Sequence, residues 1–335
     1  MQTSRAVQNV KITSVGCYVP PGTLTNADLE KIVETNDDWI VSRTGIRTRH
    51  IADENTATSD LATEAAREVL AQTNLSGSDI ETIIVCTVTP DMFFPSTACL
   101  VQDRIGAKGA WGFDLIAACS GLLYGLTTGA QMIASGSQKR VLVIGADTMS
   151  KIVDYQDRTT CVLFGDGAGA ILLEPSDEEG FGLIDFDHEV DGSGGNYLCM
   201  PAGGSHKPAS CETVRQRLHY VHQDGQQVYK YAIRQMSDVC ERVLKRNGLT
   251  PDDIDLLIPH QANARIISAV ASRLGLPPEK MVVNIDRYGN TTGGTIPLAT
   301  RDAITSGRLK KGDLVLMAAV GAGLTSGAAL WRWAY

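Results

Sequence analysis

The sequence predicts an α/β protein in which helices cover the faces of β-sheets. Strand-length apolar runs, such as Thr82–Thr87 and Val141–Gly145, alternate with amphipathic stretches such as Asp60–Gln72. This alternation is typical of βαβ units, which build sheets between layers of helix. The same pattern occurs twice along the chain, so we expect two similar halves.

The internal repeat is visible in several strand-like segments. Residues 78–85 resemble residues 252–259, and the apolar run 141–144 resembles the run 314–317. The members of these pairs lie 174 and 173 positions apart, respectively. A near-constant offset across several elements indicates a duplicated unit. We therefore expect the two halves to pack against each other.

Composition narrows the class of protein. The chain has 335 residues, of which 43% are hydrophobic and 20% charged, as in ordinary globular proteins. Apolar runs such as Ile83–Val88 are too short to cross a bilayer, and the polar start Met1–Ala6 predicts no signal peptide. The net charge of −8 argues against nucleic-acid binding. The eight cysteines include no CxxC pair, which argues against a zinc site and favours a reducing cytoplasm.

Cys119 is the strongest candidate for a nucleophile. It follows the strand-like run Phe113–Ile116 and opens a helical stretch over residues 120–135. Unpaired N–H groups and the positive end of the helix dipole favour a thiolate at such a position. The alternative is a buried structural cysteine, because free thiols often behave as small apolar groups.

His260 and Asn290 are the candidate partners of this thiol. His260 follows the predicted strand Asp255–Ile258, and Asn290 lies 171 positions after Cys119, at the start of the equivalent helix. Ligand sites in such folds gather where strands end and helices begin, so the three side chains should converge. The structural alternative for His260 is a polar residue that merely ends a strand. The structural alternative for Asn290 is a helix N-cap.

The candidates are divided between two predicted domains. Residues 1–180 would form the half that carries Cys119, and residues 181–335 the half that carries His260 and Asn290. The site would then lie between the halves.

Six motifs occur together over nearly the whole chain. They are DWIVSRTGI (38–46), DLIAACSGLL (114–123), FGDGAGA (164–170), IPHQAN (258–263), RYGNTTGGT (287–295) and GAGLT (321–325). Their order and spacing resemble those of the β-ketoacyl-acyl carrier protein synthase III family, which starts type II fatty-acid synthesis. The resemblance implies a thiolase-like fold, with two duplicated βαβ halves packed as a layered αβαβα sandwich.

The resemblance also implies a decarboxylative Claisen condensation. Cys119 would take an acyl group from an acyl-CoA, and His260 and Asn290 would hydrogen-bond the thioester carbonyl of malonyl-acyl carrier protein. Two neutral donors stabilise the enolate that forms when CO2 leaves. The carbanion would attack the acyl-Cys119 carbonyl, with the backbone N–H groups of Cys119 and Ala322 holding the oxyanion. The implied enzyme is a cytoplasmic homodimer with no metal and no permanently bound cofactor.

Further motif positions imply binding roles. In acyl-CoA binding, Trp39 and Arg158 would lie beside the adenine and Arg43 at the phosphates. Asn263 would lie in the site wall and Gln226 at the CoA tunnel. Phe94 would close the acyl pocket of the partner subunit. Docking of the acidic acyl carrier protein would use Lys230, Arg234, Arg265 and Arg273. Lys230 and Arg234 share one predicted helix face, and Arg265 and Arg273 share another. Solvated helix faces are the alternative interpretation.

Several positions depart from the family pattern. Gly293 and Gly294 stand where alanines are usual, which we expect to loosen the wall beside Asn290. Ala322 interrupts a triple glycine, and Ser326 replaces a tryptophan. These changes leave the chain length and branching of the starter open.

Related activities fit the sequence less well. Thiolases need a second cysteine near the C-terminus, and none follows Cys240; elongating condensing enzymes need a second histidine, where this chain has Asn290. Hydroxymethylglutaryl-CoA synthases need a glutamate between Cys86 and Cys119, and that interval has none. Two alternatives remain: a starter-specialised relative in secondary metabolism, using malonyl on carrier protein or CoA, and a catalytically idle acyl-CoA-binding homologue. The idle homologue is expected to lose the three candidate residues.

Overall fold

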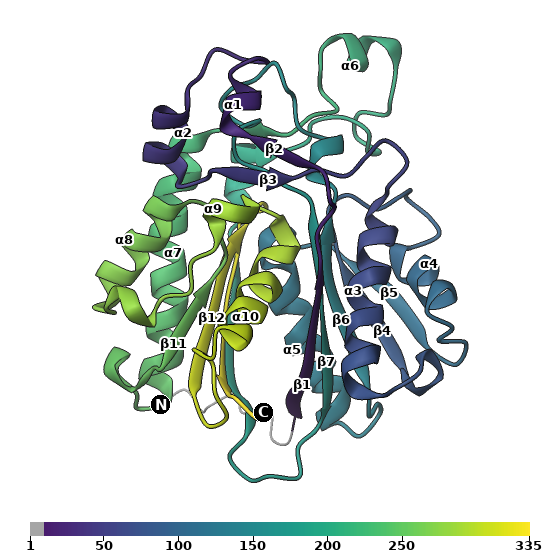
Figure 1. Cartoon of the computed structure of the whole chain (residues 1–335), viewed down its shortest axis with the longest axis vertical. Coiled ribbons are helices and arrows are strands. Elements are labelled where there is room, and N and C mark those ends of the chain that lie inside the picture. Colours follow the sequence, from purple (N-terminus) through teal and green to yellow (C-terminus); the bar gives the residue numbers. More distant parts are fainter. Residues whose placement is uncertain (1–9) are drawn as a thin grey trace.

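The computed structural model describes residues 10–335. The polar N-terminal segment, in which the sequence predicts no signal peptide, lies outside the described residues. Two sheets stand side by side, with helices between them and on their outer faces (Figure 1). The layers therefore run α-β-α-β-α across the molecule.

The first sheet has five strands in the order β1–β7–β6–β4–β5. Strand β4 is parallel to β5 and β6, whereas β7 is antiparallel to both β6 and β1. All five residues of β4 are buried, as its unbroken apolar sequence predicts for a central parallel strand. The strands are β1 (Val10–Tyr18), β4 (Thr82–Cys86), β5 (Trp111–Leu115), β6 (Val141–Asp147) and β7 (Gly167–Pro175).

The second sheet repeats this arrangement in the order β8–β13–β12–β11. Strand β11 is parallel to β12, and β13 is antiparallel to β12 and β8. A parallel bridge between Leu257 and Met281 occupies the place that β5 has in the first sheet. The strands are β8 (Gly182–Val190), β11 (Leu256–Pro259), β12 (Leu314–Gly321) and β13 (Thr325–Arg332).

Helices α5 (Gly121–Ala134) and α10 (Thr295–Thr305) form the layer between the sheets. Helix α5 approaches β4 and β6 closely because glycines recur on one of its faces. A Cβ on Gly125 would lie 2.6 Å from Cys86 Sγ and 2.8 Å from Val143 Cγ1. The side chains opposite this face are large and apolar, so α5 is anchored on both sides and its first turn is held in place.

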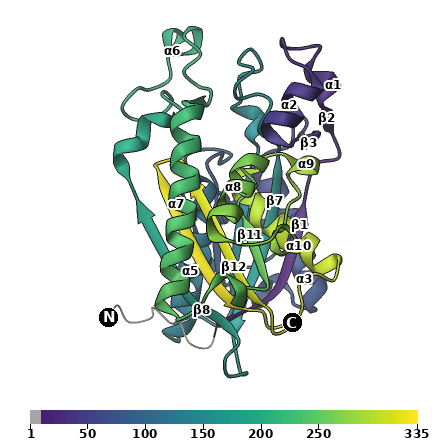
Figure 2. The ribbon, with the colours of Figure 1, turned by 90° about the vertical axis from the view of Figure 1, so that its left-hand side faces the viewer.

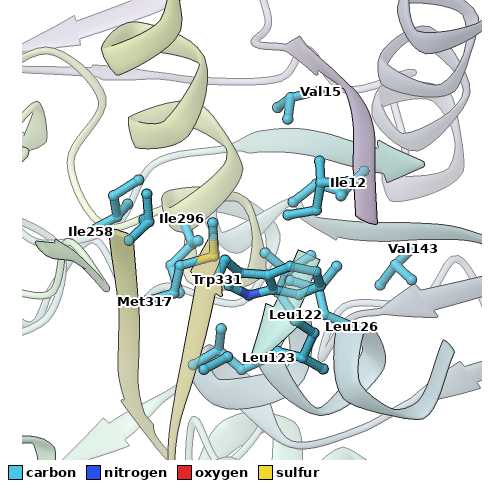
Figure 3. Close-up of a cluster of buried hydrophobic side chains, with 14 of the residues drawn as sticks. Ile12, Val15, Leu122, Leu123, Leu126, Val143, Ile258, Ile296, Met317 and Trp331 are labelled. Carbon is cyan, nitrogen blue, oxygen red and sulfur yellow. The ribbon is translucent and has the colours of Figure 1, made fainter. Parts of the chain in front are cut away.

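The main hydrophobic core lies around these central helices. Figure 3 shows the leucines of α5 beside Trp331 and Met317 of the second sheet, with Ile296 of α10 close by. Trp331 is 1% exposed. Burying so many large apolar side chains between the sheets fixes the two halves against each other.

The outer layers complete the sandwich. Helices α3 (Thr58–Thr73) and α4 (Thr97–Arg104) cover the first sheet (Figure 1). Helices α7 (Gly225–Arg246) and α8 (Ala264–Leu274) cover the second sheet (Figure 2). Short elements cover one end of the sandwich, and α6 projects from that end (Figure 1). The short elements are β2 (Thr23–Thr25), α1 (Asn26–Leu29), α2 (Asp37–Thr44), β3 (Thr48–His50), β9 (Leu198–Cys199), α6 (Cys211–Arg215), β10 (His222–Gln223) and α9 (Ile285–Tyr288).

The predicted fold class and the duplicated, layered arrangement are confirmed. Equivalent elements keep the offset seen in the sequence: β4 and β11 begin 174 positions apart, as do α5 and α10. The boundary near residue 180 falls between the end of β7 and the start of β8, and it stays a prediction. Among residues 10–335, no helix combines the length and the apolar character needed to cross a membrane.

Candidate active site

Cys119, His260 and Asn290 line one cavity of about 310 Å³ between the two halves. Cys119 comes from the turn after β5, His260 follows β11, and Asn290 precedes α10. All three are at least nine-tenths buried. The three candidates, scattered over 172 positions of sequence, are therefore brought together at the ends of parallel strands, where such folds form their sites.

A tight turn carries Cys119 from β5 into α5. Ala118, which precedes it, has a φ of +46°, a left-handed conformation that a residue with a Cβ adopts only under constraint. Backbone from the other half closes in, because a Cβ on Gly321 would lie 2.8 Å from Cys119 N. The end of β12, which leads to Ala322, thus lies directly against the turn that holds the sulfur.

The electrostatic setting of Cys119 differs from the sequence-based expectation. We expected the helix start to favour a thiolate, but burial raises the pKa of the Cys119 thiol to about 12. The negative charge of Asp147 adds to this rise, and the backbone N–H of Cys119 opposes it only partly. The free protein therefore holds a thiol at neutral pH, because desolvation of the sulfur outweighs the favourable amide.

His260 is held as a neutral imidazole. Its backbone N–H donates to the Ala318 carbonyl at 2.7 Å, which continues the pairing of β11 with β12. Burial lowers the pKa of the ring to about 3. The ring atom Nδ1 lies 2.7 Å from the Thr295 hydroxyl, which leaves Nε2 as the other polar atom of the ring.

Asn290 is fixed by its own segment and by the first half. Its backbone N–H donates to the Leu163 carbonyl at 2.9 Å. Its Oδ1 accepts a hydrogen bond from the backbone N–H of Thr292, also at 2.9 Å. Since Oδ1 is engaged, the amide Nδ2 is the group that remains to donate. The site therefore offers one sulfur and two neutral nitrogen-bearing side chains.

Asp147 supports this arrangement, although it lies in none of the sequence motifs. It is fully buried and accepts hydrogen bonds from Val88 N at 2.8 Å and Gly293 N at 3.1 Å, as well as from two threonine hydroxyls. Burial raises the pKa of its carboxyl to about 6 despite these donors. The sequence feature that could have marked Asp147 as a site residue is its place as a polar residue at the end of the apolar strand β6.

The glycines beside Asn290 do not loosen the wall, contrary to our expectation. A Cβ on Gly293 would lie 2.9 Å from Cys86 O and 3.2 Å from Gly145 Cα. A Cβ on Gly294 would lie 3.0 Å from Gly167 O. The missing methyl groups let the turn before α10 lie directly on the first sheet, so the space is filled by backbone.

The other end of the large cavity opens near α2. Trp39 and Arg43 line it, and Asn263 donates to the Arg43 carbonyl at 2.9 Å, so it ties α8 to α2. Arg158 does not line the cavity; its guanidinium lies 5.6 Å from the centre of the Trp39 ring. Gln226 is exposed and does not line the cavity. The nearby Gln223 lines it instead.

A second cavity of about 130 Å³ adjoins Cys119, and part of its wall comes from residues outside the sequence motifs. The lining is mostly apolar and combines residues from eight separated segments, which no short motif could reveal. Phe94 is 85% exposed and does not line it within this single chain. The lining is Val88, Ala118, Cys119, Met149, Ile152, Phe164, Leu198, Cys199, Met200, Val221, Thr292 and Ala322.

The four cationic docking candidates lie on α7 and α8, as predicted, and all are exposed. Their environments differ. Arg273 pairs with Asp238 and Glu241. Arg265 lies over the Tyr229 ring and lines the large cavity. No group of three or more His, Cys, Asp or Glu residues within residues 10–335 is arranged to hold a metal ion.

Comparison with known proteins shows the family to which this chain is similar. The family model described as 3-oxoacyl-[acyl-carrier-protein] synthase III matches residues 113–192, and the model of its C-terminal part matches residues 244–333. A β-ketoacyl-[acyl-carrier-protein] synthase III of Solibacter usitatus is 66% identical, over 97% of this chain and 99% of that protein.

Solved structures give the same result. The 3-oxoacyl-[acyl-carrier-protein] synthase III of Aquifex aeolicus superimposes with a TM-score of 0.89 at 46% identity, covering 97% of this chain and all of that one. The priming β-ketosynthase of the R1128 polyketide pathway is 29% identical, with a TM-score of 0.89, covering all of this chain and 98% of that one. The chain therefore belongs to the 3-oxoacyl-[acyl-carrier-protein] synthase III family.

Proposed function

We propose that this protein is a condensing acyltransferase that joins an acyl-CoA starter to malonyl-acyl carrier protein and so initiates fatty-acid synthesis in the cytoplasm. The observation that carries the proposal is the shared cavity of Cys119, His260 and Asn290. A thiol beside two neutral donors suits a reaction that forms first a thioester and then an enolate.

In the first step the Cys119 sulfur attacks the carbonyl carbon of the acyl-CoA. The new C–S bond replaces the bond to the CoA sulfur, and the proton lost by Cys119 ends on the released CoA thiol. The oxyanion of the tetrahedral intermediate is held by the backbone N–H groups of Cys119 and Ala322. The small apolar cavity beside Cys119 receives the acyl chain, because its walls are mostly hydrocarbon.

In the second step malonyl-acyl carrier protein loses CO2. The electron pair of the broken C–C bond forms an enolate, whose oxygen accepts hydrogen bonds from His260 and Asn290. A neutral imidazole is suited to this role because it donates without a positive charge that would need solvation. The enolate carbon then attacks the acyl-Cys119 carbonyl. The Cys119 sulfur leaves as a thiolate and regains a proton from solvent, so the whole reaction consumes one proton.

The remaining roles are assigned from the positions of the residues in the family motifs. Trp39 and Arg43 at the cavity mouth, with Arg158 stacked on Trp39 and Gln226 just outside, hold the nucleotide end of CoA. Asn263 orients this wall through Arg43. Phe94 reaches the acyl pocket of a partner subunit in a homodimer. The carrier protein docks on the cations of α7 and α8. The reaction as written needs no permanently bound cofactor and no metal.

A starter-specialised role in secondary metabolism is the second candidate. The observation that favours it is the likeness to a priming β-ketosynthase of a polyketide pathway. The two candidates share the chemistry and differ in the acyl group that the small cavity accepts. Only substrate preference separates them.

A substrate panel tests both candidates. Purified protein is incubated with straight, branched and aromatic acyl-CoA starters, each with malonyl-acyl carrier protein or malonyl-CoA, and products are identified by mass spectrometry. A β-ketoacyl-carrier protein formed fastest from acetyl-CoA or a similar short starter supports the main proposal. Preference for a bulky starter, or for malonyl-CoA, supports the second candidate, and no product with any pair contradicts both.

A further inference from the structure

We propose that the Thr295 hydroxyl selects the tautomer of His260. The hydroxyl donates a hydrogen bond to Nδ1, so that Nε2 carries the ring proton and acts as a hydrogen-bond donor toward the cavity. The inference rests on the proposed function, since it explains how His260 acts as a donor and not as a base. Thr295 is a positioning residue in this account, because it contacts the imidazole and not the substrate.

The distances favour donation of the hydroxyl proton to His260 over donation to Thr292. Thr295 Oγ1 lies 2.7 Å from His260 Nδ1 and 3.2 Å from the Thr292 carbonyl oxygen. A hydroxyl has one proton, and its hydrogen bonds are usually about 2.7–2.8 Å long and rarely exceed about 3.0 Å. The contact with Nδ1 is therefore the better hydrogen bond for an O–H donor. His260 and Thr295 are each 1% exposed, so water does not compete for this proton.

The ring must choose between two tautomers because it is neutral. Burial keeps the imidazole uncharged over the physiological range, so one ring nitrogen carries a proton and the other a lone pair. When Nδ1 accepts from Thr295, Nε2 is the protonated nitrogen. The reverse assignment would place a lone pair on Nε2, which would repel an enolate oxygen.

The same short turn also sets the second donor. Thr292, whose carbonyl lies near the Thr295 hydroxyl, donates its backbone N–H to Asn290 Oδ1 and so leaves Nδ2 to donate. Its φ of +50° is unusual for a β-branched residue, which shows that the surrounding contacts hold the turn in this form. Residues 292–295 thus orient both side chains as hydrogen-bond donors, the arrangement that an anionic oxygen requires.

The tautomer is measured directly by nitrogen NMR on protein labelled with ¹⁵N-histidine. The chain has six histidines, and the signal absent from the His260→Ala variant identifies the ring of interest. The expected spectrum of the wild-type free protein shows an unprotonated Nδ1 and a protonated Nε2. A protonated Nδ1 overturns the inference, and this result does not depend on any activity.

Three variants connect the tautomer to the rate. Thr295→Val keeps the shape and removes the hydroxyl, Thr295→Ser keeps the hydroxyl, and Thr300→Val makes the same change elsewhere in α10. Thr300 is a matched control because it is fully buried and its hydroxyl donates to the Ile296 carbonyl at 2.8 Å, away from His260.

We expect Thr295→Val to lose the single tautomer and to slow malonyl decarboxylation about tenfold, less than the roughly hundredfold or greater loss from removing an oxyanion donor outright. The Michaelis constant should change little, Thr295→Ser should restore the tautomer and most of the rate, and Thr300→Val should match wild type. A Thr295→Val variant that keeps both the wild-type tautomer and the wild-type rate overturns the inference. The proposed function fails separately, if His260→Ala decarboxylates normally.

Discussion

The backbone N–H of Thr292 donates to Oδ1 of Asn290 at 2.9 Å, and this contact determines which end of the Asn290 amide faces the cavity. A side-chain amide can donate or accept, and here the accepting end is already bound. Together with the neutral ring of His260, the amide makes the cavity a place where an oxygen can gain negative charge.

The first prediction concerns these two donors. Asn290→Ala and His260→Ala should each slow decarboxylation of malonyl-carrier protein by about a hundredfold or more, because each removes one donor to the enolate oxygen. Transfer of an acyl group from acyl-CoA to Cys119 should change little. Measuring CO2 release and acyl-enzyme formation separately checks this, and a variant that decarboxylates normally but fails to acylate would reverse the assignment.

The second prediction follows from the buried thiol. Because the pKa of Cys119 is raised to about 12, the fraction present as thiolate should increase about tenfold for each pH unit between 7 and 10. The rate of alkylation of Cys119 by iodoacetamide should rise in parallel without a plateau. Peptide mapping by mass spectrometry follows this site alone. A plateau near pH 7 or 8 would instead mean that the start of α5 overcomes the desolvation of the sulfur.

The third prediction concerns Asp147. Its carboxyl has a higher pKa in the folded protein, about 6, than its ordinary value of 3.8, so the folded state binds the proton more tightly. The free energy of unfolding should therefore fall as the pH rises from about 4 to about 6, by on the order of 1–3 kcal/mol from this group.

Asp147→Asn removes this titration, so the difference in stability between variant and wild type should itself depend on pH over that range. The variant should also be less stable at pH 7 by about 1–3 kcal/mol, because an asparagine cannot accept from all of the donors that surround Asp147. Urea unfolding at several pH values gives both quantities. A constant difference between pH 4 and pH 7 would show that Asp147 does not titrate there.

The fourth prediction separates the two substrates. Arg265→Glu should raise the Michaelis constant for malonyl-carrier protein more than Arg273→Glu does, because Arg273 is already paired with Asp238 and Glu241. Arg43→Ala should have the opposite selectivity, weakening acyl-CoA and sparing the carrier protein.

Salt provides the control for these charge variants. The difference between Arg265→Glu and wild type should shrink at higher ionic strength, since exposed charges are screened. Equal losses with both substrates would indicate a shared entrance, and unchanged carrier-protein kinetics would mean that these arginines are only a solvated face.

The sequence was sufficient for those features that lie within one segment or repeat at a fixed offset. The apolar runs of β4 and β6 and their counterparts β11 and β12 were visible, and the offset led from Cys119 to Asn290. Features that depend on distant contacts were not visible. Thr295 meets His260 across 35 positions, and Asp147 meets Gly293 across 146, so no local pattern marks either pair.

The pKa of Cys119 shows a second limit of the sequence. A helix start was the correct local environment, but the burial that raises the pKa comes from packing between the two halves, such as the close approach of Gly321. Similarly, the two glycines at 293 and 294 seemed to leave room, whereas strand backbone fills it. In both cases the neighbours that decide the outcome are remote in sequence.

The most direct measurement traps the acyl-enzyme. Protein is incubated with radiolabelled acetyl-CoA, digested, and the label is located by mass spectrometry, before and after addition of malonyl-carrier protein. We predict that the label appears on the peptide containing Cys119, is absent in Cys119→Ala, and moves to a β-ketoacyl-carrier protein when malonyl-carrier protein is added. Label on another residue, or label on Cys119 that malonyl-carrier protein does not remove, would contradict the account.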